Sequence, residues 1–461
     1  MRKYDAVVIG AGPGGYVAAI RLAQYGQKVA LVEKETVGGV CLNVGCIPSK
    51  ALINASEIFR SFTTASAMGL EVAGAKVDVK KLQSWKNDVV KKLTGGIAIL
   101  LKASKIDLLK GEARFVSNRE IAVDKEEIRF DNAIVATGSR PAVLKGFEPD
   151  GKFVGTSTEG LGYENIPKEL CVIGGGYIGL EIGSLYASFG SQVTVVEATD
   201  SLLPGTDPDL VRVVQKELKK RGVKIHLKSQ ALSWKGAKGR AEVHVASENG
   251  EQVIPADKIL VAVGRVPNTQ NIGLEALGVA LDQKGFIKID HQLKTNVDGI
   301  FAIGDCAGGA LLAHKASKEG VVAAGVIAGK KMTYDVRAMP AVIFTTPEIA
   351  YVGLSEAEAK MAGHTVKVGK FPFMASGKAL AIGETEGFVK IISDAGTERI
   401  LGVAIVGYDA SHLIGEACLA IEMGACAEDI ALTVHPHPTL SESFSEAAEA
   451  IHGTAIHLFT R

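Results

Sequence analysis

Two cysteines lie close together near the N-terminus, in the segment GGVCLNVGCIPSK at residues 38–50. Four residues separate Cys41 from Cys46, which is neither the C-x-x-C spacing of thioredoxin-like proteins nor a zinc site, because zinc would need a second pair. Plant-type iron-sulfur binding uses C-x₄-C but requires another cysteine three positions later, and position 49 is serine. We therefore expect no bound metal. The pair is either two inert core thiols or a reversible disulfide.

The elements around this pair come from an internal repeat. The segments YDAVVIGAGPGGYVAAIRLAQYGQKVALVEK and LCVIGGGYIGLEIGSLYASFGSQVTVVEA each predict a strand, a glycine turn, a small-residue helix and a second strand that ends in an acid. One glycine motif is weak evidence, since glycines often mark an ordinary turn. Two copies with equally spaced acids, Glu33 and Glu197, predict two dinucleotide-binding βαβ units.

Each glycine of such a unit has a physical task. The first makes a tight turn, the second lets the backbone approach a pyrophosphate, and the third lets helix pack on strand; they are Gly10, Gly12 and Gly15, and then Gly174, Gly176 and Gly179. The acid accepts hydrogen bonds from a ribose. Glu197 would also repel a 2′-phosphate, and no arginine follows it nearby, so NAD is favoured over NADP.

The position of the cysteine segment favours the reversible disulfide. It follows Glu33 directly and therefore lies beside the first predicted nucleotide. Pro48 favours a helix that starts just after Cys46, and a helix N-terminus stabilises a reactive thiolate. Thiolates react in nucleophilic steps whereas nicotinamide accepts a hydride, so a flavin is needed between them. We expect electrons to pass from dithiol to flavin to NAD.

Composition excludes several other classes of protein. The 461 residues are 47% hydrophobic, and Lys plus Arg and Asp plus Glu both total 51. This balance favours neither nucleic acid nor an anionic membrane as a partner. No secretory signal and no apolar run of about 20 residues is present, and six cysteines are too few for a secreted disulfide scaffold. We expect a cytoplasmic protein of bacterial type, although a mature mitochondrial form would look the same.

The rest of the chain predicts further parts. FDNAIVATGSRP and ADKILVAVGRVPN are expected exits from the two units, and TNVDGIFAIGDCAGG adds a strand ending near Asp305. Asp305 could instead cap the small-residue helix that follows it. From about residue 339, strands alternate with helices that begin near Ser355 and Ser411, which predicts a separate α+β domain. The fold class is α/β, with two Rossmann-like domains and a C-terminal α+β dimerisation domain.

Ten segments in order, among them GGVCLNVGCIPSKALI, VIGGGYIGLEIGS, LAHKASKEG and HPHPTLSES, resemble the pyridine nucleotide-disulfide oxidoreductases over the whole chain. The resemblance implies the branch that oxidises protein-bound dihydrolipoamide with NAD⁺, as the E3 component of 2-oxo acid dehydrogenase complexes. It implies an FAD-binding domain (1–145), an NAD-binding domain (146–268), a central domain completing the FAD site (269–338) and an interface domain (339–461). A glutathione-type reductase and a non-catalytic flavin-bound scaffold are the alternatives.

By this resemblance, Cys41 exchanges with the lipoyl sulfurs and Cys46 faces the flavin. Lys50 would lie near the flavin with Glu181 as its ion-pair partner, although a solvated helix lysine is the other interpretation. His437 would be the base and Glu442 the carboxylate that orients it. An imidazole titrates near neutral pH, as thiol deprotonation requires. Glu442 could instead cap the last helix, in the capping-box sequence Thr439-Leu-Ser-Glu442.

The resemblance also implies the cofactor contacts and partners. One FAD is bound non-covalently per subunit by Gly10, Gly12, Gly14, Gly15, Glu33, Lys34, Gly39, Val40, Lys50, Gly111, Thr137, Gly138, Asp305 and Ala313. NAD is bound by Gly174, Gly175, Gly176, Tyr177, Ile178, Glu197, Ala231, Ala262, Val263, Gly264 and Arg265. Two chains would form a homodimer that shares each active site. The lipoyl group would come from an acyltransferase (E2) or a glycine-cleavage carrier protein.

Overall fold

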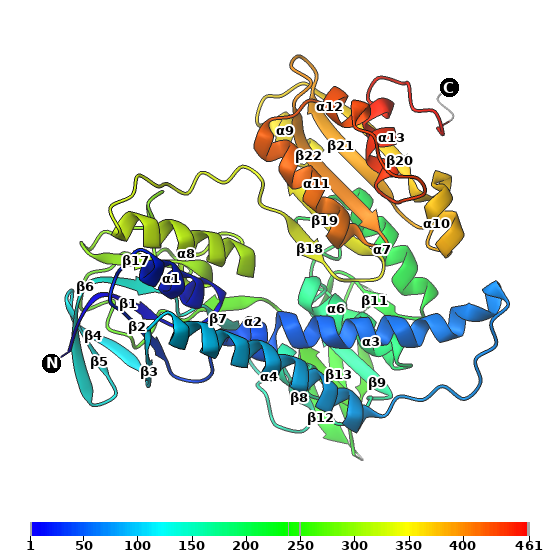
Figure 1. The fold of residues 1–461 in the computed structure, drawn as a ribbon. Coiled ribbons are helices and arrows are strands. Elements are labelled where there is room, and N and C mark those ends of the chain that lie inside the picture. Colours follow the sequence, from blue (N-terminus) through cyan, green and yellow to red (C-terminus); the bar gives the residue numbers. More distant parts are fainter. Residues whose placement is uncertain (1, 238, 249, 459–461) are drawn as a thin grey trace. The chain divides into compact units, whose positions relative to one another are not determined.

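The computed structural model describes residues 2–237, 239–248 and 250–458, and the chain divides into two compact units. The first unit contains residues 1–166 and 261–335, and the second contains residues 167–260 and 336–461. Both combine helices with sheets, as Figure 1 shows. The expected α/β class with two Rossmann-like portions and a C-terminal α+β portion is confirmed.

The first unit is built on a seven-stranded sheet with the order β3-β2-β1-β6-β5-β4, and β17 also pairs with β6. Strands β3, β2, β1, β6 and β17 run parallel, and the hairpin β4–β5 joins β6 antiparallel. The strands are β1 (Arg2–Ile9), β2 (Val29–Glu33), β3 (Asp107–Lys110), β4 (Ala113–Ser117), β5 (Glu120–Val123), β6 (Glu126–Val135) and β17 (Ile300–Ala302). The central parts of β1, β2, β6 and β17 are apolar and buried because both faces of the sheet are covered there.

The helical elements of this unit include the two that carry the cysteine segment, α2 (Gly39–Val44) and α3 (Cys46–Thr64). The others are α1 (Pro13–Gln24), η1 (Ala65–Met68), α4 (Val79–Ala103), α5 (Ser157–Gly160), η2 (Gly304–Ala307) and α8 (Ala313–Ile327). Two short strands, β7 (Ser139–Pro141) and β16 (Arg265–Pro267), pair antiparallel; β8 (Val154–Gly155) is shorter still. Helices α1 and α8 lie side by side (Figure 1). They are so close that a Cβ atom at Gly320 would lie 2.6 Å from the Gly14 carbonyl oxygen.

The second unit begins with the other βαβ segment. In one sheet, β9, β10 and β11 run parallel, and β15 lies next to β9. A separate antiparallel sheet of three strands has the order β12-β13-β14. The elements are β9 (Glu169–Ile173), α6 (Tyr177–Ser188), β10 (Gln192–Val196), α7 (Pro208–Lys220), β11 (Lys224–His226), β12 (Ser229–Ala237), β13 (Arg240–Ser247), β14 (Gly250–Ala256) and β15 (Lys258–Val261). The repeat predicted from the sequence is therefore a repeat of structure.

The C-terminal portion of this unit is a five-stranded sheet of order β18-β19-β22-β21-β20 with antiparallel neighbours. Its elements are β18 (Ala341–Ile343), β19 (Glu348–Gly353), α9 (Glu356–Met361), β20 (Val366–Pro372), η3 (Phe373–Ala375), α10 (Gly377–Ile382), β21 (Phe388–Asp394), β22 (Ile400–Gly407), α11 (Ala410–Met423), α12 (Ala427–Leu432) and α13 (Glu442–Ala450). Helices α9 and α11 begin at Glu356 and Ala410, close to Ser355 and Ser411 as expected.

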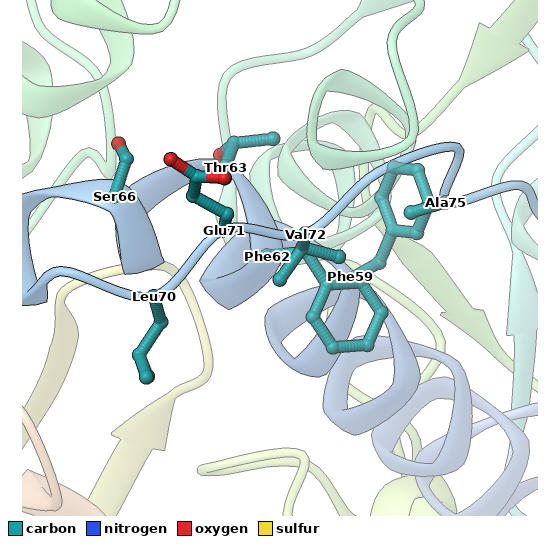
Figure 2. Close-up of a pocket in the computed structure, with 8 residues that line it drawn as sticks. All are labelled: Phe59, Phe62, Thr63, Ser66, Leu70, Glu71, Val72 and Ala75. Carbon is teal, nitrogen blue, oxygen red and sulfur yellow. The ribbon is translucent and has the colours of Figure 1, made fainter.

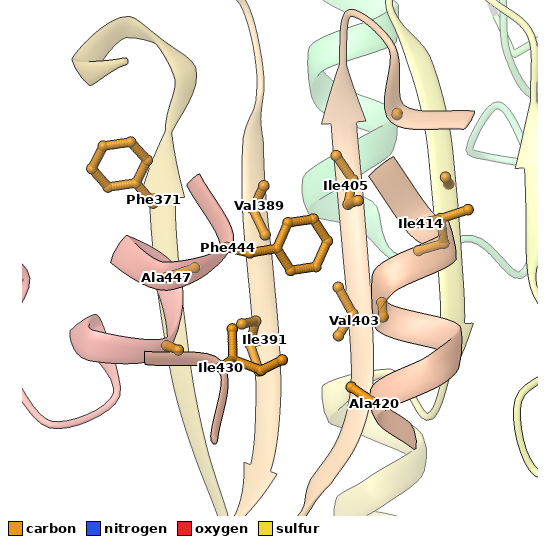
Figure 3. Packing of buried hydrophobic residues seen from close by; sticks show 14 of the residues in the cluster. Phe371, Val389, Ile391, Val403, Ile405, Ile414, Ala420, Ile430, Phe444 and Ala447 are labelled. Atoms are coloured by element: carbon orange, nitrogen blue, oxygen red, sulfur yellow. The ribbon is translucent and has the colours of Figure 1, made fainter. Parts of the chain in front are cut away.

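The core of this portion fixes the last helix. Figure 3 shows Phe444 of α13 among Val389, Val403 and Ile405 of the sheet. Phe444 is 1% exposed, and complete burial of such a side chain contributes about 1.5–3 kcal/mol. This packing holds the N-terminus of α13, where Glu442 is the first helical residue.

Candidate functional site

The first glycine turn has the geometry that a pyrophosphate requires. Gly10 has a φ of 101°, and a Cβ there would lie 2.4 Å from the Ala136 carbonyl oxygen. A Cβ on Gly15 would lie 1.8 Å from the Gly10 carbonyl oxygen, so α1 packs directly on the turn. A Cβ on Gly12, by contrast, would meet no atom within 4 Å. Gly12 is the N-cap of α1, so the open space lies at the positive end of a helix.

The second glycine turn repeats this arrangement. Gly174 has a φ of 107°. Gly176 is the N-cap of α6, and a Cβ there would again meet nothing within 4 Å. A Cβ on Gly175 would lie 3.1 Å from Glu197 Oε2. Both turns therefore leave room for a phosphate group at the position where the sequence predicts one.

The two acids are held in the same way. Glu33 Oε2 accepts a hydrogen bond from the Ala11 amide at 2.7 Å, and Oε1 accepts one from the Glu35 amide at 2.8 Å. Glu197 Oε2 accepts from the Gly175 amide at 2.6 Å, and Oε1 accepts from the Thr199 amide and hydroxyl, both at 2.8 Å. Backbone amides orient each carboxylate, which keeps further lone pairs for ribose hydroxyls.

The cysteine segment packs on the first glycine turn. The Gly38 amide donates to the Ala11 carbonyl oxygen at 2.8 Å, and a Cβ on Gly39 would lie 2.7 Å from Gly12 Cα. Gly38 and Gly39 have φ values of 101° and 58°, which glycine adopts without strain. The dithiol segment is therefore fixed beside the predicted pyrophosphate site.

The two cysteines lie on different helices and their side chains interact. Cys41 is in the short helix α2, and Cys46 is the first residue of α3. Gly45 lies between the two helices. Only glycine fits there, because a Cβ atom would lie 2.8 Å from the Val40 carbonyl oxygen. The hydrogen bond with Cys46, together with burial, raises the pKa of the Cys41 thiol, and the charge of Lys50 opposes this rise.

Lys50 and Glu181 belong to different units of the chain. Lys50 lies one helical turn after Cys46 and is half-buried. Its positive charge acts to lower the pKa of the Cys41 thiol. Glu181 is 4% exposed in α6, where its Oε1 accepts a hydrogen bond from the Phe344 amide at 2.9 Å. The ion pair between Lys50 and Glu181 stays a prediction.

Asp305 does not cap the following helix, so that interpretation is wrong. It lies in η2, whereas α8 begins at Ala313 with Leu312 as its N-cap. The Asp305 carboxylate accepts a hydrogen bond from the Ser139 hydroxyl. Arg265 Nε donates to the same Ser139 hydroxyl at 2.7 Å and lies 3.9 Å from Asp305 Oδ2. Asp305 is thus held between a buried serine and a guanidinium.

The other predicted FAD contacts also lie in the first unit. Gly111 follows β3, has a φ of 148° and donates its amide to the Glu33 carbonyl oxygen. Thr137 and Gly138 form the turn between β6 and β7. Gly14 faces α8, and Ala313 begins that helix. Lys34 is exposed beside Glu112, and Val40 is 40% exposed in α2.

The predicted NAD contacts other than the glycine turn and Glu197 lie in α6, in β12 and in the turn after β15. Tyr177 and Ile178 form the first turn of α6, and Tyr177 is 41% exposed. Ala231 lies beside a bulge in β12. The turn of Ala262, Val263, Gly264 and Arg265 connects β15 to β16. The guanidinium of Arg265 donates to Ser139, a contact that the sequence did not suggest.

His437 and Glu442 form the expected pair. The His437 side chain is 78% exposed, and its Nδ1 lies 2.9 Å from Glu442 Oε1. Glu442 Oε2 also accepts a hydrogen bond from the Thr439 amide at 2.8 Å. The N-cap of α13 is Ser441 and no side chain caps it, so the capping box predicted as the alternative is not formed. Burial raises the pKa of Glu442, but the hydrogen bonds from Thr439 and His437 outweigh it and lower that pKa. His435 faces Glu416 instead and is largely buried.

A pocket of about 430 Å³ lies elsewhere, at the far end of α3 (Figure 2). Its lining residues are Phe59, Phe62, Thr63, Ser66, Leu70, Glu71, Val72 and Ala75. Phe59 is roughly 20 Å along the helix axis from Cys46, at 1.5 Å per residue. This pocket is therefore not part of the dithiol site.

Sequence reasoning missed Ser139, Lys315 and Glu319, which support the site, and it assigned Arg265 to NAD rather than to Asp305. Ser139 and Arg265 hold Asp305, and Lys315 with Glu319 holds the backbone of Gly304. The i,i+4 spacing of a lysine and a glutamate in LAHKASKEG was a visible signal of a pair. Within the described residues, no group of three or more His, Cys, Asp and Glu side chains could hold a metal ion. No described helix is long and apolar enough to cross a membrane.

Known proteins resemble this chain in sequence and structure. Family profiles described as pyridine nucleotide-disulphide oxidoreductase and as its dimerisation domain match residues 4–320 and 339–448. Dihydrolipoyl dehydrogenases of Thermus scotoductus and Bacillus subtilis are 51% and 48% identical; the alignments cover 100% of both chains in the first case, and 98% of this chain and 97% of the relative in the second.

Solved structures give the same result. LpdA from Mycobacterium tuberculosis has a TM-score of 0.90 at 26% identity, and the flavoprotein disulfide reductase RclA from Escherichia coli has 0.87 at 29%. Each comparison covers 97% of this chain and 99% of the other. Two glycine turns, a thiol pair and matches over the whole length agree: the chain belongs to the pyridine nucleotide-disulphide oxidoreductase family, which implies the use of FAD and NAD(H).

Proposed function

We propose that the chain oxidises protein-bound dihydrolipoamide to lipoamide and reduces NAD⁺ to NADH, as the E3 component of a 2-oxo acid dehydrogenase complex. The observation that carries the proposal is the interacting pair of Cys41 and Cys46, packed on a glycine turn that is open for a pyrophosphate. The curated relatives of 45–51% identity are dihydrolipoyl dehydrogenases. A disulfide between these cysteines is the oxidised state in the proposed cycle.

The proton transfers fall to His437. A carboxylate only accepts hydrogen bonds, so Nδ1 of His437 carries a proton toward Glu442 and Nε2 is left as the base. His437 removes a proton from one substrate thiol, and the resulting thiolate attacks the Cys41 sulfur. The Cys41–Cys46 bond breaks and a mixed disulfide forms. The second substrate thiol then displaces Cys41, which releases lipoamide and leaves the enzyme with two reduced cysteines.

The remaining residues orient the reduced pair and the cofactors. A thiolate on Cys46 lies at the positive end of α3, and Lys50 stabilises negative charge on the pair. A bound FAD would supply the two-electron chemistry that links the dithiol to hydride transfer to NAD⁺. Glu33 and Asp305 would hold its ribose and ribityl hydroxyls, and Glu197 would hold the ribose of NAD.

The partners we propose are a second copy of this chain and a lipoyl-bearing protein. The matched dimerisation domain supports the homodimer. Large apolar side chains are exposed on α11 and in the segment that precedes His437, where a second copy would cover them: Leu419 (62%), Met423 (76%), Leu432 (75%) and Val434 (94%). With the His437 ring open to its surroundings, a shared site would combine the cysteines of one subunit with the histidine of the other. The lipoyl group comes from an E2 acyltransferase or a glycine-cleavage carrier.

A steady-state assay and one variant test this function. We expect dihydrolipoamide oxidation with NAD⁺ at a kcat/KM at least about 100-fold above that with NADP⁺, which Glu197 repels, and no reduction of glutathione disulfide. Cys46→Ser should lose at least about 10³-fold in activity because no disulfide can form. It should also lose the long-wavelength absorbance that dithiol produces in the flavin-bound protein. Cys171→Ser, at a buried cysteine outside the site, is the control. Full activity in the Cys46→Ser protein would refute the proposal.

A further inference from the structure

Helix α8 contains a buried ion pair that the proposed reaction does not use. Lys315 and Glu319 are one turn apart, and Lys315 Nζ lies 2.9 Å from Glu319 Oε1. Their side chains are only 8% and 3% exposed. A buried pair is weak evidence for stability, because the desolvation of two charges often exceeds their attraction. The pair therefore needs another physical reason.

That reason is the peptide group that the pair holds. Glu319 Oε2 accepts a hydrogen bond from the Gly304 amide at 2.6 Å, and Lys315 Nζ donates to the Gly304 carbonyl oxygen at 3.4 Å. Gly304 has a φ of 71° and begins the η2 turn, in which Asp305 follows it directly. One ion pair thus binds both backbone groups of the residue next to Asp305.

The same pair connects two predicted FAD contacts. It lies in the first turns of α8, whose first residue is Ala313, and it holds the turn that carries Asp305. On its other side, the Asp305 carboxylate is held by Ser139, as described above. Burial raises the pKa of Glu319, which Lys315 and the Gly304 amide oppose. Loss of the lysine would therefore leave the carboxylate without its compensation.

We infer that Lys315 and Glu319 are positioning residues for FAD. They fix the peptide group of Gly304 relative to the N-terminus of α8. The carboxylate of Asp305, which would accept a hydrogen bond from a ribityl hydroxyl, is thereby positioned as well. This inference rests on the proposed assignment of Asp305 and Ala313 to FAD. The turn requires a hydrogen-bond acceptor at position 319, whether charged or neutral. The charges of Lys315 and Glu319 are needed only to compensate each other.

Four variants separate these requirements. Glu319→Ala removes the acceptor of the Gly304 amide, and Lys315→Met leaves a buried carboxylate unpaired; each should weaken FAD binding at least about tenfold. The double variant K315M/E319Q removes both charges but keeps an acceptor, and it should restore FAD binding to within about threefold of the wild type. Lys390→Met is the matched control, because Lys390 is 2% exposed and pairs with Asp207 and Asp209 in the other unit.

The readouts are the FAD content of the purified protein, the dissociation constant from titration of the flavin-free protein, and the fluorescence of bound flavin. The control should keep wild-type values even where its unfolding temperature falls. Wild-type FAD binding in both single variants would overturn the inference, as would equal loss in the control or failure of K315M/E319Q to restore what K315M loses. If Glu319→Ala does not fold, the comparison of K315M with K315M/E319Q decides. A wild-type protein that binds no FAD would contradict the proposed function itself.

Discussion

At the scale of single residues, function depends on which atoms are left available after each side chain is held. Glu442 uses one oxygen for the Thr439 amide and the other for His437, so the imidazole keeps Nε2 for chemistry. Glu33 and Glu197 are held by backbone amides in the same pattern. In each case a buried or backbone contact fixes one side of the group and leaves the other side for a ligand.

Removal of the base should affect only the thiol chemistry. His437→Gln is expected to lower dihydrolipoamide oxidation about 10²–10⁴-fold, the usual contribution of a general base. Glu442→Gln should cause a smaller loss because the ring keeps its base but loses its orientation. Reduction of ferricyanide by NADH, which needs no substrate thiol, should stay unchanged in both. His364→Gln is the control, since His364 pairs with Asp394 in the same portion of the chain; an equal effect there would argue against a specific role for His437.

At the scale of elements, the two βαβ turns combine close packing with open space. Gly15 is needed because α1 approaches the Gly10 carbonyl oxygen, whereas Gly12 is needed because the ligand approaches the backbone. The N-cap Gly12 has a φ of −70°, which alanine adopts without strain. The two glycines of one motif therefore have separable roles.

This separation predicts opposite results for two alanine variants. Gly12→Ala should weaken FAD binding at least about tenfold while the flavin-free protein keeps its unfolding temperature, because the added methyl group meets only the ligand space. Gly15→Ala should lose about 2 kcal/mol or more of stability as well as FAD, because the methyl group overlaps the backbone. Thermal unfolding of the flavin-free proteins and FAD titration measure both. Gly26→Ala, in a left-handed turn with no nearby atom, controls for backbone strain alone.

Asp394, at the end of β21, makes a pH-dependent contribution to the stability of the folded protein. Hydrogen bonds from His364 and from the Thr397 amide and hydroxyl lower the pKa of Asp394 to about 2 from its usual 3.8. Because the folded-state pKa is the lower one, this stabilisation is present above pH 3.8 and is lost as the pH falls through about 2. Asp394→Asn should therefore lower the urea midpoint at pH about 7, and its difference from the wild type should shrink at acidic pH. A difference that does not change with pH would contradict this account.

At the scale of the whole molecule, the thiol pair and the base belong to different units of the chain. Cys41 and Cys46 lie in the first unit, and His437 and Glu442 lie in the second, on the portion that matches a dimerisation domain. The exposed apolar side chains on α11 and before His437 support the proposal that this portion meets a second copy. Dimer formation would then be a requirement for catalysis rather than for cofactor binding.

Mixed dimers test this arrangement. A dimer of one Cys46→Ser chain and one His437→Gln chain should have one intact shared site and one with both defects. We expect about half of the wild-type activity if the two defects fall in the same site of a symmetric dimer. If each site uses residues of a single chain, both sites carry a defect and the mixed dimer is inactive. Differently tagged chains, co-expressed and purified by both tags, provide the sample.

The sequence by itself determined what depends on local spacing. The glycines and the acid of each βαβ unit are close in the chain, so their periodicity predicted the turns, the helices and both predicted cofactor sites. The same is true of Cys41 with Cys46, whereas the pairing of His437 with Glu442 came from the family resemblance. For Glu442, the sequence left the capping and orienting roles as alternatives, because both use residues within one turn.

Only the tertiary structure decided the contacts between distant segments. It ruled out Asp305 as a helix cap and showed Ser139 and Arg265 holding its carboxylate, from strands that are far from it in sequence. It also showed that Lys315 and Glu319 bind the backbone of Gly304 and do not form a solvent-exposed pair. The local pattern predicts which side chains share a turn. The hydrogen-bond partner of a buried charged side chain depends instead on how helices and strands pack, and the spacing of residues in a single sequence does not reveal this packing.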